Sequence, residues 1–226
     1  MNSITVIIPV FNCERYLAAT IQSALAQTHP PAELIIVDDG STDDSAAMAQ
    51  AYTPRVRYLH QANLGPAAAR NLGVSQATGD LLAFLDADDL WTPDKLARQM
   101  QVLQTDPACE AVLGRIENFI SLELDENQRQ MLARSAAQTG DFHVGALLIR
   151  QGAFRRVGDF DKTLQSGEFI DWWARAVDRR LAYQVLPFIV MHRRLHGQNH
   201  TLRRRDTQYD YLRVVKAALN RRRPVE

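Results

Sequence analysis

The 226-residue sequence contains only two cysteines, Cys13 and Cys109. Two cysteines cannot build the disulfide framework that stabilises many small secreted domains. A hydrophobic fraction of 46% and a charged fraction of 23% are ordinary for a globular chain that buries one sizeable core. The composition therefore favours one domain over residues 1–226, without disulfide bonds.

Long apolar runs are also missing. The longest candidates, Leu81–Leu85 and Val185–Met191, have the length of a strand and fall far short of the roughly 18 residues that span a bilayer. The N-terminus leads almost directly into Ile4–Val10 with no basic region or cleavage site, so we expect no signal peptide. These absences favour a cytoplasmic protein.

The formal net charge is zero, but the charges are unevenly distributed. Residues 1–100 carry 11 acidic and 6 basic side chains, whereas residues 193–226 carry 10 basic and 3 acidic ones. An acidic half suits a bound cation. The basic C-terminal segment 201–226 is either a solvated arginine-rich helix or a contact for phosphate or the inner, anionic face of a membrane. No basic surface interleaved with aromatic residues points to nucleic acid.

Strand-like and helix-like segments alternate through the first hundred residues. Short apolar runs predict strands at Ile4–Pro9, Leu34–Val37 and Leu81–Leu85, and alternation predicts one at Val56–Leu59. Helical spacing or capping residues predict helices around Leu17–Leu25, from Ser41 to about Tyr52, at Pro66–Gln76 and from Thr92 to about Thr105. This alternation is typical of an α/β protein with a Rossmann-like, doubly wound, mainly parallel sheet and helices on both faces.

The pattern loosens after Ile116. It predicts either an amphipathic helix or a loop at Leu124–Ala137, and then a strand at Val144–Ile149, a helix at Glu168–Arg179, a strand at Ala182–Met191 and a closing helix at Asp206–Leu219. No internal repeat or low-complexity linker divides the chain, which again favours a single domain.

A short segment that contains polar residues follows each of the four predicted N-terminal strands. These segments are Phe11-Asn12, Asp38-Asp39, Gln61–Asn63 and Asp86–Asp89. Open parallel sheets bind ligands beyond the carboxyl ends of their strands. We therefore expect these four strand ends to meet in one crevice.

Asp86-Ala87-Asp88 is a candidate metal site. Two carboxylates two residues apart in extended backbone project to the same side. Such oxygen ligands suit Mg²⁺ or Mn²⁺, which share the rest of their coordination shell with waters and substrate phosphates. The same tripeptide is common in solvated turns, but its place between a predicted strand and a capped helix favours the metal site.

Asp39 and Arg70 are candidate nucleotide-binding residues. Asp38–Asp43 has the composition of a turn and helix cap, and neither role needs Asp39, whose carboxylate can accept a hydrogen bond from a base imide or a ribose hydroxyl. Arg70, on the helix predicted after Gly65-Pro66, either makes a bidentate pair with a phosphate or faces solvent.

Four segments together resemble the successive signatures of family-two glycosyltransferases of the GT-A fold. They are IIPVFN at Ile7–Asn12, VDDGSTD at Val37–Asp43, GPAAARNLG at Gly65–Gly73 and FLDADD at Phe84–Asp89. The resemblance is close over residues 1–105 and looser over Gly145–Asn199. It implies a donor half at 1–115 and an acceptor half at 116–200.

That resemblance implies an inverting, metal-dependent transfer from a nucleotide diphosphate sugar, usually a UDP-sugar, to an acceptor hydroxyl. The acceptor class would be a carbohydrate, a lipid-linked molecule or a peptide, as in polysaccharide biosynthesis. The implied roles are a nucleoside pocket lined by Pro9 and Phe11, base recognition by Asp39, base or phosphate contact by Arg70, ribose or metal contact by Asp86, and metal ligation by Asp88. The cation, Mn²⁺ or Mg²⁺, would stabilise the departing diphosphate while a carboxylate takes the acceptor proton.

Residues Gly167–Arg175 resemble the family segment that carries the catalytic base. A Glu-Asp pair is usual there and the Asp is the base, but this chain has Phe169 at that position. Glu168 and Asp171 are the nearby carboxylates. We prefer Asp171, because apolar neighbours raise a carboxylate's pKa and make it a better base near neutrality.

Residues Arg193–Asn199 are similar to the family's late arginine-and-histidine segment, in which a histidine approaches the metal or diphosphate. This makes His196 a candidate metal ligand. The four-residue spacing of His192, His196 and His200 would suggest zinc on a helix, but Gly197 argues against a helix there.

Phe169 also keeps a second hypothesis open, a catalytically silent protein that binds a nucleotide sugar in the same crevice. A nucleotidyltransferase or a dinucleotide-dependent oxidoreductase usually needs a glycine-rich loop after the first strand. Pro9–Glu14 contains no glycine, so these enzyme classes are disfavoured.

Overall fold

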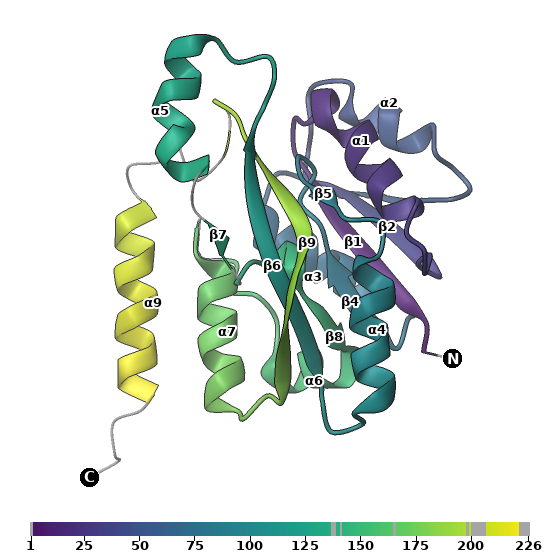
Figure 1. The fold of residues 1–226 in the computed structure, drawn as a ribbon, viewed down its shortest axis with the longest axis vertical. Coiled ribbons are helices and arrows are strands. Elements are labelled where there is room, and N and C mark those ends of the chain that lie inside the picture. The colour runs from purple at the N-terminus through teal and green to yellow at the C-terminus, as the bar shows by residue number, and fades with distance from the viewer. Residues whose placement is uncertain are drawn as a thin grey trace.

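The computed structural model describes residues 2–136, 139–140, 142–164, 166–197, 199 and 207–221. This part of the chain forms one nine-stranded sheet in the order β3-β2-β1-β4-β8-β6-β9-β5, with β7 paired to β6 (Figure 1). No helix within these ranges has both the length and the apolar character needed to cross a membrane.

The N-terminal half has the predicted alternation. Its strands are β1 (Ile4–Val10), β2 (Glu33–Asp38), β3 (Arg57–His60) and β4 (Leu81–Phe84), and all four are parallel. The helices are α1 (Glu14–Leu25), α2 (Ser45–Gln50), α3 (Pro66–Gln76) and, after the short β5 (Leu90–Trp91), α4 (Lys95–Thr105). Nearly every residue of β1 is buried, because helices cover both faces of a parallel sheet.

The C-terminal half extends the same sheet. Its strands are β6 (Ala111–Ile120), β7 (Thr139–Gly140), β8 (Leu148–Arg150) and β9 (Tyr183–Leu195). Strand β8 runs antiparallel to both β4 and β6, and β9 runs parallel to β6. The helices are α5 (Glu126–Ala136), α6 (Gln151–Val157), α7 (Glu168–Asp178) and α9 (Thr207–Arg221).

Several local predictions for this half need correction. The predicted strand Val144–Ile149 is wrong in its first half, where Val144–Ala146 forms the 3₁₀ turn η1. The Gly145 amide donates to His143 Nδ1 at 3.1 Å and fixes that turn. Strand β6 and helix α6 were not predicted. Strand β6 starts with four consecutive buried residues, a run whose periodicity does not distinguish a strand from a helix.

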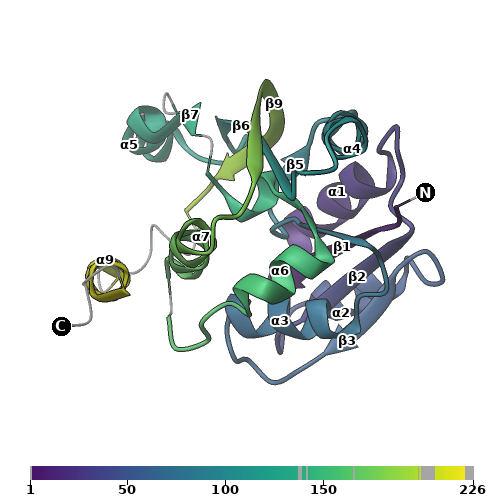
Figure 2. The same cartoon turned by 90° about the horizontal axis from the view of Figure 1, so that it is seen from below.

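Helices cover both faces of the sheet, as expected (Figure 2). Helices α1 and α4 pack with one core cluster, and α3, α6 and α7 pack with the other. Helix α3 lies very close to β1, since a Cβ at Gly73 would come within 2.4 Å of Ile7 Cγ2. The mainly parallel α/β sheet with two helical layers is thereby confirmed.

The C-terminal basic segment is only partly described. Helix α9 packs beside α7, and Arg221 forms an ion pair with Asp178 at 3.0 Å. Residues 200–206 and 222–226 lie outside the described residues, so the choice between a solvated helix and a contact for phosphate or membrane stays open for them.

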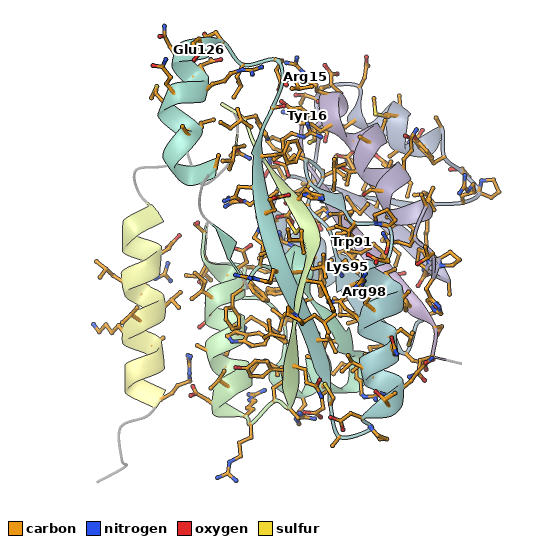
Figure 3. All side chains as sticks on the ribbon, in the orientation of Figure 1. Arg15, Tyr16, Trp91, Lys95, Arg98 and Glu126 are labelled. Carbon is orange, nitrogen blue, oxygen red and sulfur yellow. The ribbon has the colours of Figure 1, made fainter. Side chains whose placement is uncertain are left out.

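Lys95 is fully buried at the start of α4 (Figure 3). Its Nζ donates to Gln99 Oε1 at 2.9 Å and to the Leu147 carbonyl at 3.3 Å, and it lies 4.1 Å from the Trp91 ring centroid. The Gln99 amide in turn donates to the Ala146 carbonyl at 2.7 Å. This network ties α4 to the η1 turn that follows His143.

We expect this lysine to make stability depend on pH. Burial lowers the pKa of Lys95 well below its ordinary value of 10.5. Between the folded-state pKa and 10.5 the unfolded chain therefore binds one more proton, so the free energy of unfolding rises with pH in that window. Lys95→Met removes the titrating group. Between pH 7 and 10, the wild type should therefore gain stability relative to Lys95→Met. Urea titrations at several pH values measure the free energy of unfolding of both proteins, and the value for Lys95→Met minus that for the wild type should fall as the pH rises. A constant difference would contradict the prediction.

Candidate active site

The carboxyl ends of β1, β2 and β4 open onto one cleft of about 1390 Å³. Its volume exceeds the roughly 300–1,000 Å³ of most small-molecule pockets. All the candidate site residues except Asp171 line it, namely Pro9, Phe11, Asp39, Arg70, Asp86, Asp88, Glu168 and His196.

Asp39 is almost fully buried in the cleft wall. Its Oδ1 accepts hydrogen bonds from Gln61 Nε2 at 2.7 Å and from the Leu64 amide at 2.9 Å, and its Oδ2 accepts one from the Gly65 amide at 2.8 Å. The carboxylate thus holds the loop that leads into α3. Base recognition by Asp39 stays a prediction, and the structure adds that this residue shapes the loop beside it.

Arg70 is not solvent-facing, so that alternative is wrong. Its side chain is 4% exposed, and its two terminal nitrogens donate to Glu168 Oε1 and Asp86 Oδ1, both at 2.6 Å. Burial alone would lower the pKa of Arg70, but the carboxylates of Asp86 and Glu168 outweigh burial and raise it. Arg70 is therefore a permanent cation that ties the acidic loop to the start of α7.

The acidic loop after β4 holds three carboxylates in different environments. Burial opposes the charge on Asp86, but the Arg70 guanidinium keeps its pKa below the ordinary value. Asp88 Oδ2 lies 2.9 Å from His196 Nε2. Asp89 is 2% exposed, and burial followed by repulsion from Asp88 and Asp86 raises its pKa well above the ordinary value.

These groups fit a hard cation. One ligand atom each from Asp86, Asp89 and His143 lies within 4.8 Å of the others. His143 Nδ1 accepts the Gly145 amide hydrogen, so the neutral ring carries its proton on Nε2 and donates rather than ligates. The carboxylate oxygens are then the natural ligands, as Mg²⁺ and Mn²⁺ prefer.

Sequence reasoning assigned no metal role to Asp89 or His143. Asp89 was visible as the third acid of the Asp86–Asp89 run. No sequence pattern pointed to His143, because the fold alone brings its Nε2 to within 3.7 Å of Asp86 Oδ2. Of the histidines considered for zinc, His192 pairs with Glu117 at 3.0 Å, and His200 lies outside the described residues.

Arg194, near the end of β9, binds the acidic loop through hydrogen bonds. Its guanidinium lies 4.8 Å from the Tyr16 ring centroid and 4.7 Å from that of Phe119. Its Nε donates to the Asp88 carbonyl at 2.9 Å, and its amide donates to Asp89 Oδ1 at 2.8 Å. These contacts hold the end of β9, which directly precedes His196, against the acidic loop.

The choice of Asp171 as the base needs correction, because the structure does not bring it to the cleft. Its Oδ2 accepts from Arg175 Nε at 2.8 Å, one helical turn away, and its Oδ1 lies 3.5 Å from Arg221 Nη1. Asp171 therefore meets two arginines, one of them in α9, rather than an apolar pocket. Its ion pairs anchor α9 to α7.

Glu168 and Phe169 form the wall of the cleft at the start of α7. Phe169 is 8% exposed, and its ring stacks on Trp172 with centroids 6.3 Å apart, so it belongs mainly to the core. Glu168 is the carboxylate of α7 that lines the cleft, and its Oε1 is held by Arg70.

The protein is thus an α/β protein whose mainly parallel sheet carries an acidic loop at its strand ends. Residues 5–164 match the profile of Glycosyl transferase family 2. This match covers more than half of the chain, and the chain belongs to that family.

Two relatives illustrate the extent of the similarity. The chain is 35% identical to the glycosyltransferase GlyG of Streptococcus pneumoniae over 161 residues, which cover 70% of this chain and 51% of GlyG. It is 49% identical to an uncharacterized glycosyltransferase of Nostoc sp. over 106 residues, which cover 45% of this chain and 33% of that protein. The chain thus matches about half or less of the length of these relatives.

A solved structure shows the same fold. Staphylococcus aureus TarS residues 1–349, in complex with UDP-GlcNAc, has a TM-score of 0.76 and 18% sequence identity, and the match covers 96% of this chain and 65% of that one. The GT-A fold is thereby confirmed.

Proposed function

We propose that this glycosyltransferase is an inverting enzyme that uses a UDP-sugar and a divalent cation, Mn²⁺ or Mg²⁺. The observation that carries the proposal is the group of three carboxylates, Asp86, Asp88 and Asp89, at the cleft end of β4. A diphosphate would be repelled by this group unless a cation lay between them. TarS, which shares the fold, binds UDP-GlcNAc, and this supports UDP as the nucleotide.

Asp86, Asp88 and Asp89 would ligate the cation, while Arg70 keeps its ion pair with Asp86. His196 would lie beside the cation, because it contacts Asp88. When bound, the cation would neutralise the diphosphate as it leaves. Pro9, Phe11 and Asp39 would form the nucleoside end of the cleft.

Glu168 would act as the base in place of Asp171. Its Oε1 accepts a hydrogen bond from Arg70, and no described residue makes a hydrogen bond to its Oε2, so this oxygen would accept the proton of an acceptor hydroxyl. The inverting outcome follows from a single displacement, in which this hydroxyl attacks the anomeric carbon from the face opposite the leaving diphosphate.

The alternative is a catalytically silent nucleotide-sugar-binding protein. Phe169 favours it, because an apolar ring occupies the position where the family usually carries the base. Turnover of a UDP-sugar separates the two functions.

The organisation of the whole protein also stays a proposal. We propose one domain over residues 1–226, with the donor half at 1–115, the acceptor half at 116–200 and a basic segment at 201–226. A cytoplasmic site of action, with this segment at the inner membrane face, fits the arginine content of the sequence.

Calorimetry tests the donor proposal. We expect UDP to bind at least tenfold more tightly with Mn²⁺ than with a chelator, which corresponds to about 1.4 kcal/mol. GDP and dTDP serve as controls for the base. Equal UDP affinity in both conditions would refute the metal role.

A further inference from the structure

One side of the cleft is apolar. The residues Phe142, Val144, Phe169 and Ile170, here called the apolar wall, all line the cleft. Phe142 precedes η1, Val144 is its first residue, and the other two lie at the start of α7. Phe142 is 51% exposed and Ile170 is 48% exposed. Helix α7 lies well away from β3, whose following loop lines the proposed nucleoside end (Figure 2).

Phe142 is held in this exposed position. Its ring centroid lies 5.3 Å from that of Trp173, which in turn lies 4.9 Å from that of Tyr183 in an edge-to-face arrangement. Such tilted aromatic pairs are favourable in themselves. The ring is therefore supported from behind while about half of its surface stays open.

The chemistry beside the wall indicates what binds there. Glu168, the proposed base, directly precedes Phe169 and Ile170 at the start of α7, and all three residues line the cleft. A molecule that places a hydroxyl at Glu168 therefore has the apolar wall within the same cleft for the rest of its atoms. The wall's four side chains offer no hydrogen-bond partner, so they would leave polar groups unpaired and would favour apolar ones.

We propose that the apolar wall is an acceptor subsite, and that the acceptor carries its hydroxyl on a molecule with an alkyl or aryl group, such as a glycoside with an apolar aglycone. This inference rests on the proposed glycosyl transfer, because it takes the cleft beside Glu168 as the acceptor end. The inference narrows the acceptors to molecules that carry an alkyl or aryl group, and it excludes free hexoses as preferred acceptors.

Binding of three glucosides to the full chain with UDP and Mn²⁺ tests the proposal. We expect octyl or phenyl β-D-glucoside to bind at least tenfold more tightly than methyl β-D-glucoside, with octyl used below its micelle concentration. A preference for octyl indicates an alkyl chain, and a preference for phenyl indicates an aromatic group. Equal binding of all three would overturn the subsite.

Matched variants locate the effect. Phe142→Ser with Ile170→Ser should reduce the preference to about twofold or less, with UDP affinity unchanged. Phe188→Ser is the control, since Phe188 is similarly exposed, at 47%, but lines a separate groove with Thr92 and Arg98. The same loss in Phe188→Ser, or an intact preference in the double variant, would overturn the assignment. Thermal melts check that each variant is folded.

UDP titrations on the same samples keep the two proposals apart. UDP binding without any apolar preference would refute the subsite and leave the donor proposal intact. An apolar preference that depends on Phe142 and Ile170, without any UDP binding, would refute the donor proposal instead.

Discussion

A Glu168→Gln variant is expected to bind UDP as the wild type does and to lose about 100-fold or more of its transfer rate, the usual scale for removing general-base help. Glutamine keeps an oxygen that can accept from Arg70 Nη1, so the ion pair becomes a neutral hydrogen bond and the loop geometry is largely retained. The acceptor proton then has no carboxylate to receive it. Steady-state kinetics and UDP calorimetry on the same preparation measure both quantities.

Asp171→Asn is the matched control on the same helix. Asp171 lies outside the cleft and pairs with Arg175 and Arg221, so we expect a lower melting temperature and an almost unchanged transfer rate. An inactive Asp171→Asn beside an active Glu168→Gln would reverse the assignment of the base. If the wild type binds a UDP-sugar but never turns it over, the silent alternative is correct.

An Asp88→Asn variant is expected to lose the gain in UDP affinity that Mn²⁺ provides, a loss of at least about tenfold. Asparagine retains the shape of aspartate and an oxygen that can accept from Asn199 Nδ2, but it removes the negative charge that attracts the cation. Without metal, the variant should bind UDP as well as the wild type or better, because one repulsive charge next to the diphosphate is gone. Titrations with Mn²⁺ and with chelator show both effects.

Asp94→Asn controls for a general change of charge. Asp94 is paired with Arg98 and lines the separate groove, so this variant should respond to Mn²⁺ as the wild type does. A full Mn²⁺ effect in Asp88→Asn would show that Asp86 and Asp89 suffice as ligands and would remove Asp88 from the metal site.

The position of the cleft followed from local sequence patterns. The apolar runs of β1, β2 and β4 are short and continuous, and turn residues bound them. Because parallel strands end at the same edge of a sheet, polar residues at those ends had to meet, and Asp39, Asp86 and Asp88 do line one cleft. This inference needed only the order and type of the elements.

The roles of individual charges depended on partners distant in sequence. Arg70 pairs with Asp86, 16 residues away, and with Glu168, 98 residues away, so no local pattern could choose between a phosphate contact and a solvent-facing side chain. His143 likewise reaches Asp86 only because the η1 turn lies beside the acidic loop.

Glu168 and Asp171 show most clearly what the sequence determined and what the tertiary structure decided. The sequence by itself determined that a helix begins at Glu168 and carries both carboxylates three residues apart. Only the tertiary structure decided that Glu168 lines the cleft beside Arg70 while Asp171 meets Arg175 and Arg221. The physical reason is that helical periodicity fixes which residues share a face, whereas contacts with other elements, Arg70 of α3 for Glu168 and Arg221 of α9 for Asp171, decide what each carboxylate meets.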